Sequence, residues 1–249
     1  KECRFGGVQI HGAHGYLVSQ FLSSRHNQRD DQWGGSIENR MRFVLAVLEA
    51  IRGEVGEEYP IGIKLNSADF MNDGFTEEES MSVVQALSEA GIDIIEVSGG
   101  TYESPAMMGF EVKESTLRRE AYFLEYAEKV RALVDTPLVV TGGFRSAMGM
   151  TDALQSGATD FIGLARPMAV LPDFPSRLLA DADYSMELQK LSTGIAAIDQ
   201  MVMLDVTWYE QQLARMGKGR RPDPSMGAWP VFAKTVWSMG SYALRARRA

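Results

Sequence analysis

The sequence predicts an α/β fold in which repeated βα units build a parallel sheet. Short apolar runs rich in β-branched residues alternate with stretches of helical periodicity. The same helix-to-strand transition occurs twice: Gly91 and Gly157 each end a helical stretch shortly before an apolar run. Strands that alternate with helices pair in parallel, since a parallel pair needs a long crossover connection.

Five strands are expected within roughly the first 170 residues. In chain order they span 7–10, 61–65, 92–97, 138–141 and 161–164. Each run is short and apolar, and a helical pattern follows it, which indicates consecutive βα units.

Two helices between these strands carry explicit start and stop signals. Thr76 and Glu79 have the spacing of a capping box, so a helix is expected to begin after Thr76 and to end at Gly91. Ser146 is the expected N-cap of a second helix that ends at Gly157. Both helices therefore return the chain directly to the next strand.

The pattern changes in the last quarter of the chain, where no strand is expected. Residues 186–216 predict one or two amphipathic helices, 217–224 a basic turn-rich linker, and 229–248 a last helix. We therefore expect two domains, a partial barrel over 1–184 and a helical extension over 185–249.

Composition narrows the class of protein. A 45% hydrophobic content is ordinary for a globular protein with a core, and a net charge of −8 disfavours a nucleic-acid or anionic-membrane binder. The lone Cys3 excludes an internal disulfide framework and cannot by itself ligate an iron–sulfur cluster, which takes about four thiolates. No secretory signal pattern and no run of about 18 apolar residues occurs, so a cytoplasmic enzyme of small molecules is expected.

Two imidazoles and a phenol follow the first expected strand. His11 and His14 are three residues apart, and Tyr16 comes two residues later. At the carboxyl end of a barrel strand these side chains face the active-site mouth, where they supply two hydrogen-bond donors and one proton source. Two alternatives stay open for the bare spacing: ordinary loop histidines with a packed tyrosine, and a metal site, although nearby acidic residues lack ligand spacing.

Longer phrases favour the first of these interpretations, the active-site one. The phrases HGAHGYL, QFLS and WGGSIENRMRF closely resemble the fourth-strand signature of the Old Yellow Enzyme family, the FMN-dependent NADH:flavin oxidoreductases. The later motifs IGIKLN, EVSGG, TGGFR and GLARP agree with the family in order and spacing. The resemblance covers about residues 3–178 and implies a (β/α)8 TIM barrel of which this chain holds about strands four to eight.

The resemblance also implies roles for the first motif. His11 and His14 match the family's pair that hydrogen-bonds the substrate carbonyl or nitro oxygen, and Tyr16 matches its proton donor. Hydride addition to an activated alkene builds negative charge on that oxygen, which imidazole N–H groups stabilise. A tyrosine with an ordinary pKa near 10 stays protonated at neutral pH and can deliver its proton to carbon.

The remaining motifs imply a flavin site. Lys64 matches the cation that faces the flavin pyrimidine edge and favours the reduced cofactor; its alternative is a lysine that snorkels to the surface. Glycines after a strand let backbone N–H groups approach a phosphate, and an arginine binds it through two N–H groups. The expected flavin-binding residues, in addition to Lys64, are Gly142, Gly143, Phe144, Gly163, Ala165 and Arg166, with Ala165 standing where many relatives have Gly.

Two further features have weaker implications. Tyr102, in the loop after the third expected strand, is a candidate for the substrate pocket, although a loop aromatic is as often a packing residue. The last helix, 229–248, ends in three arginines and is either a basic surface-binding element or a helix packed on the barrel or on a second subunit.

The function implied is a ping-pong reductase: NAD(P)H reduces FMN, which then reduces an electron-poor alkene. A relative acting on dienoyl thioesters or amines, and a non-catalytic barrel remnant that binds a partner protein, are the alternatives. Five parallel strands cannot close an eight-stranded barrel. We therefore expect an N-terminal segment or another subunit of a homo-oligomer to complete it.

Overall fold

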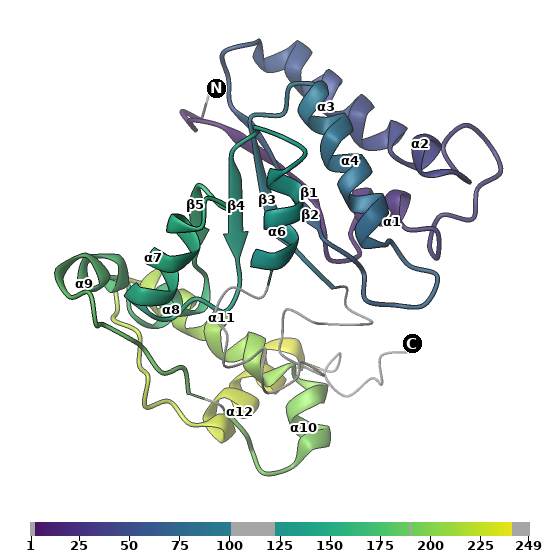
Figure 1. Ribbon diagram of the computed structural model, residues 1–249. Coiled ribbons are helices and arrows are strands. Elements are labelled where there is room, and N and C mark those ends of the chain that lie inside the picture. The colour runs from purple at the N-terminus through teal and green to yellow at the C-terminus, as the bar shows by residue number, and fades with distance from the viewer. Residues whose placement is uncertain (1–2, 101–122, 190, 241–249) are drawn as a thin grey trace. The chain divides into compact units, whose positions relative to one another are not determined.

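The computed structural model describes residues 3–100, 123–189 and 191–240 (Figure 1). The strands are β1 (Val8–Gly12), β2 (Ile61–Asn66), β3 (Ile94–Ser98), β4 (Leu138–Thr141) and β5 (Phe161–Gly163). The helices up to β5 are α1 (Leu17–Leu22), α2 (Ile37–Arg40), α3 (Arg42–Val55), α4 (Glu77–Glu89), α6 (Leu124–Arg131) and α7 (Ala147–Gln155). After β5 come α8 (Arg166–Val170), α9 (Phe174–Ala180), α10 (Ala196–Met201), α11 (Leu204–Met216) and α12 (Ala228–Met239).

The five strands form one parallel sheet in the order β1-β2-β3-β4-β5. Each strand pairs with the next strand in the sequence, and a helix-containing connection joins each pair. This topology confirms the predicted succession of βα units, and every expected strand is present within three residues of its predicted bounds.

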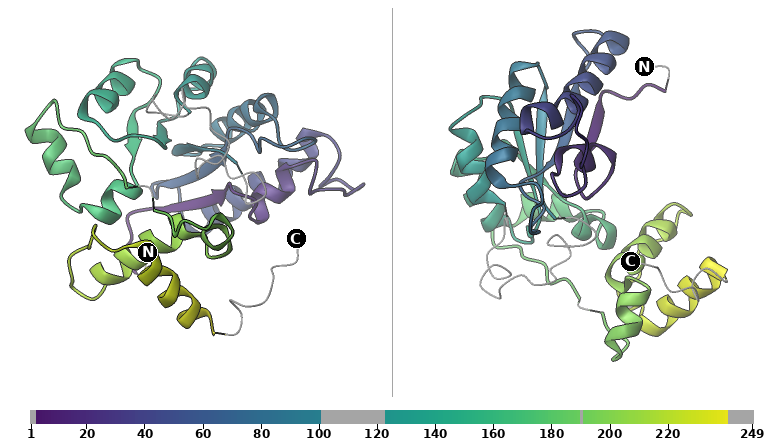
Figure 2. Two further views of the ribbon diagram at one scale, coloured as in Figure 1. Left: turned by 90° about the horizontal axis from the view of Figure 1, so that it is seen from below. Right: turned by 90° about the vertical axis from the view of Figure 1, so that its right-hand side faces the viewer.

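The two faces of the sheet differ because side chains alternate along each strand. On one face Ile63, Ile95 and Val140 are buried, and Figures 1 and 2 show α3, α4 and α6 lying against this face. The opposite face, here called the polar face, carries Gln9, His11, Lys64, Glu96 and Thr141. The side chains available for chemistry on the sheet are therefore those of the polar face.

A glycine and an aspartate recur between helix and strand. Gly91 and Gly157 have φ of 80° and 74°, a conformation that costs other residues energy, and each ends the preceding helix as predicted. Two residues after Gly91, Asp93 accepts a 2.7 Å hydrogen bond from the Ile61 backbone N–H, and three residues after Gly157, Asp160 accepts a 2.8 Å bond from Leu138. Each aspartate thereby fixes the start of the neighbouring strand.

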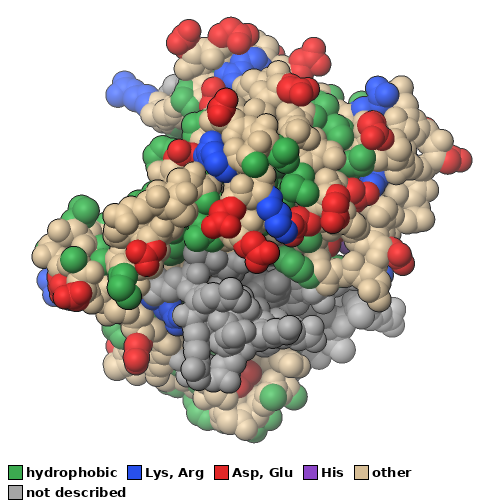
Figure 3. Space-filling model, viewed as in Figure 1, with side chains coloured by type: hydrophobic (Ala, Val, Ile, Leu, Met, Phe, Trp, Pro, Cys, Tyr) green, Lys and Arg blue, Asp and Glu red, His purple; other side chains and the backbone are tan. Residues whose placement is uncertain are grey.

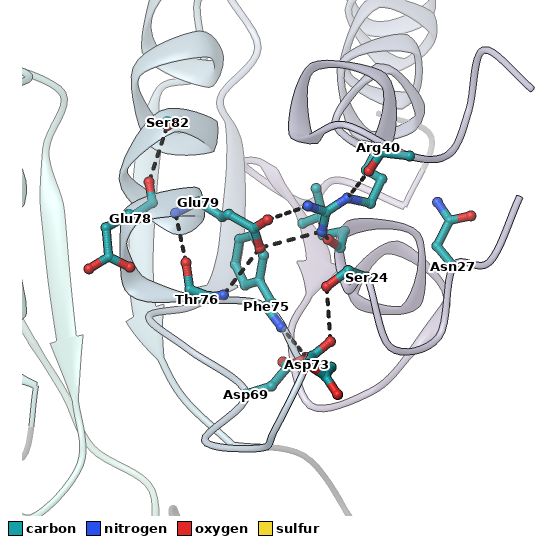
Figure 4. A network of polar contacts seen from close by, with 12 residues as sticks. Ser24, Asn27, Arg40, Asp69, Asp73, Phe75, Thr76, Glu78, Glu79 and Ser82 are labelled. Carbon is teal, nitrogen blue, oxygen red and sulfur yellow. Dashed lines mark hydrogen bonds and ion pairs between the residues drawn. The ribbon is translucent and has the colours of Figure 1, made fainter. Parts of the chain in front are cut away.

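Helix α4 begins with the predicted capping box. The Glu79 backbone N–H donates to Thr76 Oγ1 at 3.2 Å, and the Thr76 backbone N–H donates to Glu79 Oε2 at 3.3 Å. The Glu79 carboxylate also binds the buried guanidinium of Arg40, which donates to the Leu22 and Gly35 carbonyls as well (Figure 4). One ion pair thus ties α2, in the connection between β1 and β2, to α4, the helix that follows β2.

The chain divides into two compact units. Unit 1 comprises 1–144 and 148–163 and contains the sheet; unit 2 comprises 145–147 and 164–249 and contains α8 to α12. The core of unit 2 is built around the fully buried Trp208, whose Nε1 donates to the Met226 carbonyl at 2.8 Å. The domain boundary predicted at residue 184 stays a prediction.

The described residues after 185 contain the helices α10, α11 and α12, with one difference from the predicted helical pattern. The described residues of 186–195 are not helical, and Asp199 accepts hydrogen bonds from Ser192 and Thr193 to hold this stretch against α10. Helix α10 therefore begins ten residues later than the amphipathic pattern from residue 186 predicts. The expected last helix is present as α12, and 241–249 lie outside the described residues.

Among the helices of the described residues, none combines the length and the apolar character that a membrane span requires. Acidic and basic side chains are interspersed over the described part of the face in Figure 3.

Candidate active site

The three residues of the first motif lie together where β1 ends. His11 is the fourth residue of β1, His14 follows in the loop, and Tyr16 is the N-cap of α1. The ring centroids of His11 and His14 are 5.2 Å apart, and those of His11 and Tyr16 are 4.8 Å apart. The His11 side chain and the 45% exposed Tyr16 are accessible, so the cluster can meet a ligand at the carboxyl edge of the sheet.

The backbone of His14 is held in an unusual conformation. Its φ of 62° lies in the left-handed region, which costs a non-glycine residue energy of order 1–3 kcal/mol when strained. Asn66 stabilises this turn, because its Oδ1 accepts from the His14 backbone N–H at 3.3 Å while its Nδ2 donates to Asp69 and to the Gly100 carbonyl. Loops after three consecutive strands thereby fix where the imidazole stands.

The hydroxyl of Ser98 contacts one ring nitrogen of His14. His14 Nε2 lies 2.7 Å from the hydroxyl of the fully buried Ser98. Burial, together with the positive charges of Lys64 and His11, lowers the pKa of His14 to about 4, so the ring is neutral at pH 7 and carries one N–H. If the Ser98 hydroxyl donates to Nε2, the proton stands on Nδ1, which then is the donor for a ligand oxygen.

The lowered pKa of His14 predicts a pH dependence of stability. The unfolded chain takes up a proton near the ordinary pKa of 6.5, whereas the folded ring does so only near 4. The free energy of unfolding should therefore fall as the pH drops from 6.5 to 4, because the unfolded state binds the additional proton there.

Urea denaturation at several pH values measures this loss. A His14→Gln variant should show a shallower decline between pH 6.5 and 4, and a matched His26→Gln variant should keep the decline of the unaltered protein. Identical slopes for all three proteins would contradict the assignment.

Lys64 does not snorkel to the surface but pairs on the polar face. Its Nζ lies 2.9 Å from Glu96 Oε1, and the two side chains are only 20% and 15% exposed. His11 is the register neighbour of Lys64, and Lys64 is that of Glu96, so the three stand in one row across β1, β2 and β3. Burial and the charge of Lys64 lower the pKa of His11, against the opposing charge of Glu96.

The glycine turn after β4 fits a phosphate group. Gly142 and Gly143 have φ of 127° and 86°, values that side chains strongly disfavour, so glycine is required for the turn. Such a turn exposes backbone N–H groups at the carboxyl end of a strand, which is what a phosphate cradle needs. Gly163, on the neighbouring strand β5, is required for lack of space, since a Cβ there would lie 1.8 Å from Thr141 Oγ1.

The other predicted flavin residues fall on both units. Phe144 is buried in unit 1, whereas Ala165 and Arg166 belong to unit 2, where the Arg166 guanidinium lies 6.0 Å from the ring centroid of Tyr209. Their common role at one phosphate stays a prediction. Tyr102 lies outside the described residues.

Sequence reasoning missed three residues of this site. Glu96 and Ser98 appear only within the motif EVSGG, and Asn66 only within IGIKLN. Their polar side chains alternate with the buried Ile95, Val97 and Leu65 of the same strands. That alternation was the available signal. No group of three or more His, Cys, Asp or Glu side chains among the described residues is arranged to hold a metal ion.

Comparison with known proteins shows the family of this chain. Residues 1–183 match the profile of the NADH:flavin oxidoreductase / NADH oxidase family. The chain is 37% identical to the NADH-dependent flavin oxidoreductase iccE of Talaromyces variabilis over 87% of its own length and 56% of that protein.

Solved structures give the same result. A 2-naphthoyl-CoA reductase is 31% identical with a TM-score of 0.66, and the alignment covers 72% of this chain and 27% of that one. The Old Yellow Enzyme homologue of Zymomonas mobilis is 26% identical with a TM-score of 0.55, over 76% and 49%. The five-stranded sheet is thus part of a (β/α)8 barrel, and the chain spans about half or less of the lengths of these three proteins.

Proposed function

Because the chain belongs to the NADH:flavin oxidoreductase / NADH oxidase family, we propose that its site serves an FMN-dependent reduction of electron-poor alkenes by NAD(P)H. The observation that carries this proposal is the cluster of His11, His14 and Tyr16 at the carboxyl edge of the sheet, where His11 is the register neighbour of Lys64. FMN, when bound, would supply the hydride carrier between the nicotinamide and the alkene.

The two imidazoles would bind the substrate oxygen. An enone, or a similar alkene, gains negative charge on its carbonyl oxygen as hydride reaches the β-carbon. Nδ1–H of His14, set by Ser98, and an N–H of His11 would donate to that oxygen. Donors held in fixed positions stabilise the developing charge without reorganisation, which is their advantage over water.

Tyr16 would complete the reaction as the proton donor. Its ring contacts that of His11, so a substrate whose oxygen is held by the imidazoles stands close to the phenol. The phenol would give its proton to the α-carbon. Tyr102 is proposed to line the same pocket, which the nicotinamide and the alkene would occupy in turn.

Lys64 and the turn after β4 would hold the flavin. Lys64 supplies positive charge beside the ring, and Gly142 and Gly143 supply backbone donors for the phosphate. Arg166 is proposed to bind the same phosphate through two N–H groups. We further propose that another chain segment or a second subunit pairs with the outer strands β1 and β5, each of which has one neighbour in the described sheet. A cytoplasmic setting is proposed with it.

Arg166→Ala tests the phosphate assignment. Loss of a charge-assisted contact should weaken FMN binding by about 1.5–3 kcal/mol, measured by titration of the purified protein with FMN. Arg177→Ala is the matched control, because Arg177 is a half-exposed arginine of the same unit that pairs with Asp173. If the Arg166→Ala protein bound FMN as tightly as the control, the assignment of Arg166 to the phosphate would be wrong.

A further inference from the structure

The carboxylate of Glu96 joins its own strand to three other strands on the polar face. Its Oε1 accepts from Lys64 Nζ at 2.9 Å and from Thr141 Oγ1 at 2.7 Å, and its Oε2 accepts from Gln9 Nε2 at 2.9 Å. These partners come from β2, β4 and β1, while Glu96 itself stands on β3. The proposed reaction assigns no role to this carboxylate.

The carboxylate is ionised at neutral pH although it is largely buried. Burial raises the pKa of Glu96, but hydrogen bonds from Lys64 and Thr141, the charge of Lys64 and a hydrogen bond from Gln9 lower it below its usual range. A buried carboxylate and ammonium 2.9 Å apart form a pair without net charge. The positive charge that a neighbouring group experiences from Lys64 is therefore reduced.

We propose that Glu96 is a positioning residue that holds the Lys64 ammonium on the polar face and sets how much positive charge the active site experiences. The inference rests on the proposed function in one respect, because it takes Lys64 to face the flavin. Thr141 and Gln9 fix the orientation of the carboxylate, since they occupy both of its oxygens. The pair also acts on the histidines, because Lys64 disfavours and Glu96 favours their protonated forms.

A first experiment needs no flavin. The pKa of His11 is followed by NMR titration in the unaltered protein and in the Glu96→Gln, Glu96→Asp and Lys64→Met variants. The pKa should fall further in Glu96→Gln, return toward its starting value in Glu96→Asp, and rise in Lys64→Met, because each change alters the charge beside the ring.

The same titration carries its own controls. His26 lies outside the cluster, with its Nδ1 3.2 Å from Ser23 Oγ. Its NMR titration curve should be the same in every variant. Glu89→Gln removes an equal charge from the exposed end of α4 and should leave His11 unchanged. If Glu96→Gln fails to fold, Lys64→Met alone decides. An unchanged His11 in the folded variants would overturn the proposal.

A second experiment measures the reduction potential of the bound flavin. Glu96→Gln should shift the equilibrium toward reduced flavin about tenfold, or roughly 30 mV for a two-electron couple, and Lys64→Met should shift it the other way. A merely structural Glu96 would change melting temperature and flavin content but leave the potential of bound flavin unchanged, which would contradict the proposal. Should the unaltered protein bind no flavin, the proposed function fails, while the histidine titration still decides the Glu96–Lys64 relation.

Discussion

Arg40→Met is expected to lower the free energy of unfolding by about 3 kcal/mol or more, because it leaves the Glu79 carboxylate and two carbonyls without their buried cation. Arg40 is only 4% exposed and Glu79 is 23% exposed, so water replaces the lost partner poorly. Urea denaturation measures the change. The variant should also loosen the loop after β1, which carries the histidine cluster.

Arg29→Met is the matched control for this prediction. Arg29 pairs with Asp31, but the two side chains are 52% and 41% exposed, so the loss should be much smaller than for Arg40→Met. Adding Glu79→Gln to Arg40→Met should recover part of the loss, because no unpaired charge then remains. Equal losses for Arg40→Met and Arg29→Met would show that the buried pair has no special role.

Tyr16→Phe should slow alkene reduction by about 100-fold or more while leaving reduction of the flavin by NADH nearly unchanged. Reduction of the alkene by the flavin needs a proton at carbon, whereas reduction of the flavin by NADH does not. Stopped-flow measurement of each half-reaction separates the two. The ring contact with His11 is retained in the variant, so substrate binding should change little.

Tyr59→Phe is the control for Tyr16→Phe. The Tyr59 hydroxyl donates to the Phe5 carbonyl at 2.6 Å, before the start of β2 and so at the opposite end of the strands from the histidine cluster. Its loss should affect neither half-reaction. If Tyr16→Phe slowed both half-reactions equally, a structural role for Tyr16 would be the better account.

Local signals predicted the fold well. The capping box at Thr76 and the helix stops at Gly91 and Gly157 depend on residues that are close in sequence, and the structure confirms them. The start of α10 was predicted ten residues too early. There the hydrogen bonds of Asp199 to Ser192 and Thr193 favour an irregular stretch over the amphipathic pattern.

The site was predicted only in part, because its geometry depends on the register between strands. The spacing of His11, His14 and Tyr16 indicated a cluster, and the three rings do meet. The partners Glu96 and Ser98 come from β3, more than 80 residues away. A single sequence does not reveal which polar residues of distant strands come together, so neither the pairing of Lys64 with Glu96 nor the contact of His14 with Ser98 was predicted.

The central claim is that this site uses FMN to pass a hydride from NAD(P)H to an electron-poor alkene. The most direct test is the absorbance of the purified, FMN-titrated protein under anaerobic conditions, first with NADH and then with an enone. We expect FMN to bind, its visible absorbance to bleach on adding NADH, and the absorbance to return on adding the enone. A protein that binds no FMN, or whose reduced flavin is reoxidised by none of a panel of enones, nitroalkenes and unsaturated thioesters, would contradict the claim.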